Sequence, residues 1–327
     1  MYKGKIKDFS KTLLACSVVA VSVFMFGCKD TVNAPTLGTN SQSNLSAADQ
    51  QAMSQMADQD SVVATFDPNY NESQTDNFLG KTNNAITPYF VWQHVILTNK
   101  TYDFTTVGDS AYLKLTKTYQ GVLNIAASNQ DTLTKPDTII TKNFASTLVT
   151  QLLFLRVDST SNPMLNWKLL GVSLVSGGAN VNTGNFKINS LTLTFGNNDS
   201  TITITDPTNF FINRHYGWKW GHSCPEFHMD DSVTVSVEVY SAYVDTDFVT
   251  LTYGADFFGM HRNKVKLDLV SQTTSGNGYV RVFQRTFNLR NYRGYFSAVL
   301  NTLTKQSIYD DSAPVESNTW GLPYKIR

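Results

Sequence analysis

The sequence predicts a mainly β protein with an α+β N-terminal part: a curved antiparallel sheet with short helices, followed by an antiparallel β-sandwich. From residue 89 onward, apolar and polar residues alternate with period two, as in strands with one buried face. Helical spacing of apolar residues precedes this pattern, and turn signals recur at sandwich spacing in the second half. We therefore expect an α+β domain over residues 46–177 and a β-sandwich domain over residues 178–327.

Residues 1–28 have the layout of an export signal peptide. Four lysines precede an apolar run over residues 13–26, which is shorter than the roughly 20 residues that a membrane-spanning helix needs. The run ends in Met25-Phe26-Gly27-Cys28, in which Gly27-Cys28 resembles the lipobox of bacterial lipoproteins. The resemblance implies that Cys28 carries a palmitate-type lipid and becomes the first residue of the mature chain.

The residues after Cys28 indicate where in the cell the protein lies and how its folded part is connected to the lipid. Lys29-Asp30 resembles the start of surface-export signals in bacterial lipoproteins, which implies a cell-envelope protein on the outer membrane, with surface exposure as a hypothesis. Residues 29–45 are rich in Thr, Asn, Ser, Gly and Pro and have no periodicity. Such a composition buries too little apolar surface to order itself, so we expect a flexible tether. The chain would then contact the membrane through its N-terminal lipid.

Cysteine content and charge argue against a disulfide-stabilised fold and against a nucleic-acid-binding protein. Cys16 leaves with the signal and Cys28 carries lipid, so Cys224 is the one thiol left and no internal disulfide is expected. Cleavage also changes the balance from 26 basic and 26 acidic residues to 22 and 25, a net charge of −3. No basic stripe is present, so a nucleic-acid partner is not expected.

In the first domain, Ser46 is the expected N-cap of a helix, with Asp49 placed to bond back to it. A second short helix is expected over residues 73–79, ended by Gly80. Four long strands should follow, near residues 92–104, 111–118, 144–157 and 167–175.

This element order resembles the NTF2-like and cystatin-like class, in which a curved sheet wraps a helix. The resemblance covers residues 46–177. It implies a cone between helix and sheet, where an open pocket lined by Trp92 and Phe154 would hold a small molecule.

The second domain is expected to begin after Gly177-Gly178. Its clearest alternation is Val233, Val235, Val237 and Val239. Further strands are expected near residues 191–195, 202–204, 265–269, 280–282, 294–303 and 322–326. The sequence Gly276-Asn277-Gly278 favours a tight hairpin turn, because Asn-Gly readily adopts positive φ.

From residue 230 onward, the pattern of short strands resembles an immunoglobulin-like domain. The Cys…Trp…Cys signature of antibody domains is missing, so the resemblance concerns architecture alone.

Residues 215–231 hold the densest chemistry in the chain, with three of the five histidines and the one expected free thiol. Imidazole and thiolate are suitable ligands for zinc or copper. The candidate ligands are His215, His222, Cys224, His228 and Asp230. Their spacing matches no established metal motif, and a packed connection between strands with solvated histidines is the competing interpretation.

Three other chemistries stay open. Cys224 is a conceivable thiol nucleophile if His222 or His228 acts as its base. Asp245 and Asp247, or Asp230 and Asp231, could ligate calcium, but no Asp-x-Asp-x-Asp-Gly loop is present and ordinary solvated turns are the favoured interpretation. Clustered aromatic residues suit stacking on sugar rings, but they also suit a sandwich core.

No motif for catalysis is found, so the favoured function is non-catalytic: binding, adhesion or a structural role at the cell envelope, with a glycan or an envelope protein as partner. The alternatives are a zinc- or copper-binding protein or metal-dependent enzyme that uses the 215–231 loop, and a small-molecule binder that uses the cone of the first domain.

Overall fold

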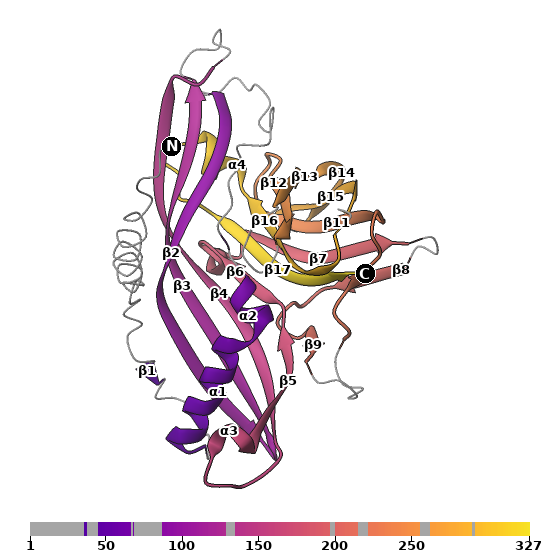
Figure 1. Cartoon of the computed structure of the whole chain (residues 1–327). Coiled ribbons are helices and arrows are strands. Elements are labelled where there is room, and N and C mark those ends of the chain that lie inside the picture. The colour runs from indigo at the N-terminus through magenta and orange to yellow at the C-terminus, as the bar shows by residue number, and fades with distance from the viewer. Residues whose placement is uncertain are drawn as a thin grey trace, which may run out of the picture. The chain divides into compact units, whose positions relative to one another are not determined.

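The computed structural model describes residues 36–37, 45–66, 68, 87–128, 135–196, 200–214, 222–255, 262–289 and 292–327. The predicted fold class is confirmed: the chain is mainly β, with two antiparallel sheets and a few short helices (Figure 1). No described helix is long and apolar enough to cross a membrane. The signal peptide, most of the tether and the expected helix at residues 73–79 lie outside the described residues.

Helix α1 (Ala47–Gln59) begins where the capping pattern predicts. Ser46 is its N-cap, and the Ser46 hydroxyl accepts a hydrogen bond from the Asp49 backbone N–H at 3.1 Å. Asp49 also accepts a hydrogen bond from Trp167 Nε1 at 2.9 Å, so the same turn ties the helix to a strand. Helix α2 (Ser61–Thr65) follows and is capped by Asp60; the sequence pattern did not predict it.

Three very long antiparallel strands build the first part of the large sheet. They are β2 (Thr87–Val107), β3 (Ser110–Ser128) and β4 (Thr138–Arg156). Each is longer than the alternation predicts. Met53 and Ala57 of α1 pack against one end of this sheet, where Leu113, Leu152 and Phe154 are buried. Helix α3 (Pro163–Asn166) and β5 (Trp167–Ser173) complete this end.

The large sheet continues across residue 177 through β6 (Val175–Gly178), which pairs with β4 on one side and β17 (Ser317–Ile326) on the other. A Cβ at Gly177 would overlap the Thr147 carbonyl oxygen, so the close pairing requires glycine there. Residues 37–327 form one compact unit. The expected domain division at residue 177 stays a prediction.

Beyond β6, the large sheet adds β17, β16 (Gly294–Leu303), β12 (Phe248–Ala255) and β13 (Asn263–Lys266), in that order. Strand β12 is not among those expected from the sequence, although Val249, Leu251 and Tyr253 alternate with threonines. Helix α4 (Lys305–Tyr309) connects β16 to β17 and was not expected either.

A second sheet of five strands packs on this part of the large sheet (Figure 1). Its order is β14 (Asp268–Ser275), β15 (Gly278–Asn288), β11 (Ser232–Ser241), β7 (Phe186–Phe195) and β8 (Ser200–Ile204). The four alternating valines of β11 are all buried between the sheets, as predicted. The remaining short elements are β1 (Thr36–Leu37), η1 (Val181–Thr183), β9 (Phe211–Asn213) and β10 (Glu226–Phe227).

The predicted hairpin between β14 and β15 forms, but its turn is centred one residue earlier than Asn277-Gly278. Ser275 pairs with Gly278, which leaves Gly276 and Asn277 as the central residues. Gly276 adopts a φ of 57°, so glycine at the first central position supplies the positive φ that a hairpin turn needs.

Candidate functional site

Those predicted metal ligands that are among the described residues do not converge on one point. His215 lies outside the described residues. The His222 ring stacks on Phe210 with 3.9 Å between ring centroids, and its backbone bridges to the β9 segment. Cys224 is half-buried and its thiol faces the Pro323 carbonyl oxygen at 3.7 Å. Burial raises the pKa of Cys224 to about 11, which disfavours the thiolate that a metal ion or a nucleophilic mechanism needs.

His228 and Asp230 lie in an exposed turn after β10. The backbone N–H of His228 donates to Asp231 Oδ2 at 2.7 Å, and Asp230 adopts a positive φ of 63°. Within the described residues, no three His, Cys, Asp or Glu side chains are close enough to hold a metal ion. The zinc or copper site, which also involves His215, stays a prediction. Cys28 lies outside the described residues, so its lipidation stays a prediction too.

The two residues proposed to line a pocket in the first domain are far apart. Phe154 of β4 pairs with Ala111 of β3, and Ala111 pairs with Thr106 of β2. Trp92 lies 14 residues before Thr106 on β2. At about 3.3 Å per residue, this separation is roughly 46 Å. Phe154 is also fully buried in the contact with α1. Trp92 and Phe154 therefore do not line one cavity.

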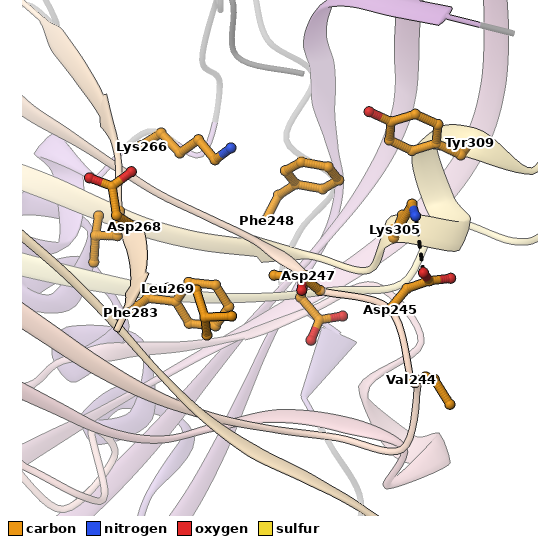
Figure 2. A pocket seen from close by; sticks show the side chains of 12 residues that line it. Val244, Asp245, Asp247, Phe248, Lys266, Asp268, Leu269, Phe283, Lys305 and Tyr309 are labelled. Carbon is orange, nitrogen blue, oxygen red and sulfur yellow. Dashed lines mark hydrogen bonds and ion pairs between the residues drawn. The ribbon is translucent and has the colours of Figure 1, made fainter. Parts of the chain in front are cut away.

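The structure instead forms a pocket at one edge of the sandwich, which we call the sandwich-edge pocket (Figure 2). Its volume is about 380 Å³. The β11–β12 loop, the β13–β14 junction, β15 and α4 contribute its walls. The lining residues are Val244, Asp245, Thr246, Asp247, Phe248, Lys266, Leu267, Asp268, Leu269, Phe283, Lys305 and Tyr309.

A buried ion pair holds the β11–β12 loop that forms one wall. Arg281 of β15 and Asp247 have fully buried side chains, and Arg281 Nη1 lies 2.6 Å from Asp247 Oδ2. Arg281 Nη2 also donates to the carbonyl oxygens of Tyr243 and Val244, each at 2.7 Å, and Nε donates to Gln272 at 2.7 Å. Because one guanidinium bonds to three residues of the β11–β12 loop and also to β14, it fixes the geometry of the loop that forms this pocket wall.

The charge of Asp247 is governed by opposing effects. Burial raises the pKa of Asp247 to about 6, while the Arg281 guanidinium favours the carboxylate. Protonation would leave the Arg281 charge buried without a counter-ion, so we treat the pair as ionised at neutral pH.

Two aromatic rings and two lysines form the opposite side of the pocket. Phe248 and Tyr309 stack at a centroid distance of 6.1 Å and an interplanar angle of 15°. Lys266 Nζ lies 5.4 Å from the Phe248 ring centroid, and Lys305 Nζ lies 5.5 Å from that of Tyr309. Figure 2 shows Lys305 paired with Asp245, at 3.0 Å, and Lys266 directed toward Phe248. Burial lowers the pKa of Lys266 despite the nearby Asp268 carboxylate.

Each carboxylate of the pocket is paired with a cationic side chain. Asp245 binds Lys305, Asp247 binds Arg281, and Asp268 binds Arg285 at 2.8 Å. The pocket therefore offers hydrogen-bond donors, acceptors and aromatic surface with little net charge, which suits a polar, uncharged ligand.

Sequence reasoning missed this site for identifiable reasons. Asp245 and Asp247 were considered, but as possible calcium ligands or solvated turns. Arg281 lies between Val280 and Val282, and the buried face of the strand carries Arg281 and Phe283 instead of the valines. An arginine at an inward-facing position of a strand, together with an Asp-x-Asp loop, is the signal that could have indicated the pair.

Comparisons with known proteins assign no relationship. No protein-family model matches the chain, and no curated protein matches it.

Proposed function

We propose that this chain is a lipid-anchored cell-envelope protein of the outer membrane with a non-catalytic binding role, and that its sandwich-edge pocket binds an uncharged glycan. The anchor rests on the lipobox resemblance at Cys28. The binding role rests on one observation, a pocket in which an aromatic pair faces donors and acceptors whose charges are already balanced.

The dimensions and chemistry of the pocket support a sugar ligand. A volume of about 380 Å³ is within the range of small-ligand sites and suits one or two sugar rings. Sugar hydroxyls both donate and accept, so they can bond to Lys305 and Asp245 at the same time. Phe248 and Tyr309 line the pocket and are 9% and 8% exposed, so each contributes a small apolar surface for sugar C–H groups.

The same contacts support a binding role over a catalytic one. General acid–base chemistry needs a carboxyl group poised to exchange a proton with its substrate. Asp245, Asp247 and Asp268 are each held by a cationic side chain within 3.0 Å. The proposal keeps the predicted domain architecture, an NTF2-like domain followed by an immunoglobulin-like sandwich. In this architecture the loops of the sandwich hold the ligand site.

Binding is tested with the full-length chain in detergent and neutral oligosaccharides, such as cellotriose, galactotriose and chitotriose, by isothermal titration calorimetry. Lys305→Gln and Asp245→Asn remove pocket hydrogen bonds at partly exposed positions and should each weaken binding about tenfold, the loss of one hydrogen bond to a charged group. Lys187→Gln, an exposed change on β7, is the matched control and should have no effect. Equal affinities for all variants, or no binding at millimolar sugar, would contradict the pocket assignment.

The anchor is tested separately by mass spectrometry of the membrane-extracted protein. The expected N-terminal fragment begins at Cys28 and carries a lipid adduct. A mature N-terminus elsewhere, or an unmodified Cys28, would contradict the lipoprotein assignment without affecting the pocket.

A further inference from the structure

A second site lies where three strands meet near the end of β17. Strand β16 lies beside β17 (Figure 1) and pairs with it antiparallel. In this register, Tyr295 faces Lys325 and Gly294 faces Ile326. Strand β10 pairs with the other edge of β17 in parallel, and Glu226 faces Lys325. Glu226, Lys325 and Tyr295 therefore form one row across three strands.

A second row lies two residues further along, on the same face. The Arg327 backbone N–H donates to the Phe227 carbonyl oxygen at 3.0 Å, and Met229 N–H donates to the Arg327 carbonyl oxygen at 3.3 Å. These bonds extend the pairing of β10 with β17 by one step and place His228 beside Arg327. Arg293 directly precedes Gly294, the first residue of β16. His228, Arg327 and Arg293 line one groove together with Lys325, and the groove volume is about 690 Å³.

Strand alternation separates these rows from the core. Phe227, Tyr324 and Ile326 occupy the intervening positions, and they are buried between the two sheets of the sandwich. The side chains of the two rows consequently project from the outer face of the large sheet. We call this surface the cationic groove.

Charge in the cationic groove is not balanced. Arg293, Lys325 and Arg327 have cationic side chains, whereas Glu226, which is paired with Arg327, is the one acidic side chain in the two rows. Arg327 remains 62% exposed despite that pair, so its guanidinium can still reach a ligand. Arginine offers fixed pairs of N–H donors that match the oxygens of a carboxylate or phosphate.

The Tyr295 ring adds an aromatic surface beside these cations. Tyr295 is 66% exposed, and Lys325 Nζ lies 5.4 Å from its ring centroid. A tyrosine ring this exposed contributes little to the core. It does provide a flat apolar surface for a sugar ring whose acidic group binds the neighbouring cations.

We infer that the cationic groove binds an anionic saccharide, with a carboxylate or phosphate held by Arg293, Lys325 and Arg327 and a sugar ring placed against Tyr295. The concave shape favours this ligand over a flat membrane surface. The two short rows provide too few cations to follow a nucleic-acid backbone. This site is separate from the sandwich-edge pocket and does not depend on the function proposed for that pocket.

The test uses the full-length chain in detergent, tri-galacturonate as the anionic probe and galactotriose as its neutral counterpart, in isothermal titration calorimetry. Arg293→Gln and Lys325→Gln should each weaken tri-galacturonate binding at least tenfold, and Tyr295→Ala should weaken it several-fold. Raising the salt concentration from 50 to about 200 mM should also weaken it, because these charges are exposed. The matched control, Lys187→Gln, should stay within twofold of the unchanged protein.

Four results would overturn the inference. The first is no binding of tri-galacturonate, and the second is equal binding of galactotriose. The third is unchanged affinity in Arg293→Gln and Lys325→Gln. The fourth is tighter binding of inorganic phosphate, a single-stranded oligonucleotide or anionic vesicles than of tri-galacturonate. Lys305→Gln should leave tri-galacturonate binding unchanged, which distinguishes failure of this site from failure of the pocket.

Discussion

The sandwich-edge pocket and the cationic groove lie on the same sandwich but hold their charges in opposite ways. In the pocket, Arg281 and Asp247 neutralise each other out of contact with water. In the groove, Arg293 and Arg327 are exposed, and their strands are stabilised by the apolar residues on the other face. The difference shows that the buried Arg281–Asp247 charges serve structure, whereas charge in the groove is available to a ligand.

The largest expected effect is on stability at the wall of the pocket. Arg281→Met leaves the Asp247 carboxylate buried without its cation and should lower the free energy of unfolding by about 3–5 kcal/mol. Arg327→Met is the counterpart in the groove and should change it by less than about 1 kcal/mol. Urea denaturation of both variants measures this. Equal losses would contradict the structural role of the pocket charges.

A similar contrast is expected for the aromatic residues. Phe248→Ala removes a ring that stacks on Tyr309 and should cost about 3 kcal/mol of stability. Tyr295→Ala removes an exposed ring and should cost about 0.5 kcal/mol or less. Thermal unfolding followed by circular dichroism compares the two variants. A large loss for Tyr295→Ala would show that its ring supports the fold.

The reactivity of Cys224 is expected to be low, although the cationic groove is nearby. Burial raises the pKa of its thiol to about 11, which outweighs the lowering effects of Arg214 and Lys325. The thiolate fraction at pH 8 should therefore be about 100-fold smaller than that of an ordinary thiol and rise tenfold per pH unit.

This prediction is checked by the rate of reaction with a disulfide reagent in a Cys16→Ser/Cys28→Ser variant, so that only Cys224 reacts. Unfolding in urea should restore an ordinary rate. Rapid reaction of the folded protein at pH 7 would support the nucleophilic or metal-binding interpretations of the loop.

The smallest effect is expected at the mouth of the pocket. Lys305 and Asp245 form a partly exposed pair, so Lys305→Gln should change the free energy of unfolding by less than about 1 kcal/mol. Chemical denaturation of this variant also shows whether any loss of glycan binding reflects the pocket or a loss of fold. A change above about 2 kcal/mol would mean that the pair is structural.

Local features were predictable from the sequence because their causes are local. The α1 start follows from the Ser46 hydroxyl and the backbone three residues on. The burial of the β11 valines follows from strand alternation, because every second side chain of a strand points to the same face and the apolar face packs on the core. Strand lengths were underestimated, since β2 and β4 continue through polar residues that the alternation does not include.

The sites were not predictable in the same way. The sequence singles out residues 215–231 for their histidines and cysteine. The described part of that loop instead contributes His228 and Met229 to the groove, beside Arg293 just before β16 and Lys325 of β17. The pocket depends on a strand whose inward face carries Arg281. No short-range pattern indicates either arrangement.

The sequence alone determined the mainly β class, the capped first helix, most of the strands and the expectation of a lipid at Cys28. These depend on neighbours along the chain. The tertiary structure decided how Asp247 meets Arg281, 34 residues away, and how Glu226 comes to lie beside Lys325, 99 residues away. Pairing of distant strands sets these contacts, and it depends on the free energy of the whole fold instead of on any local segment.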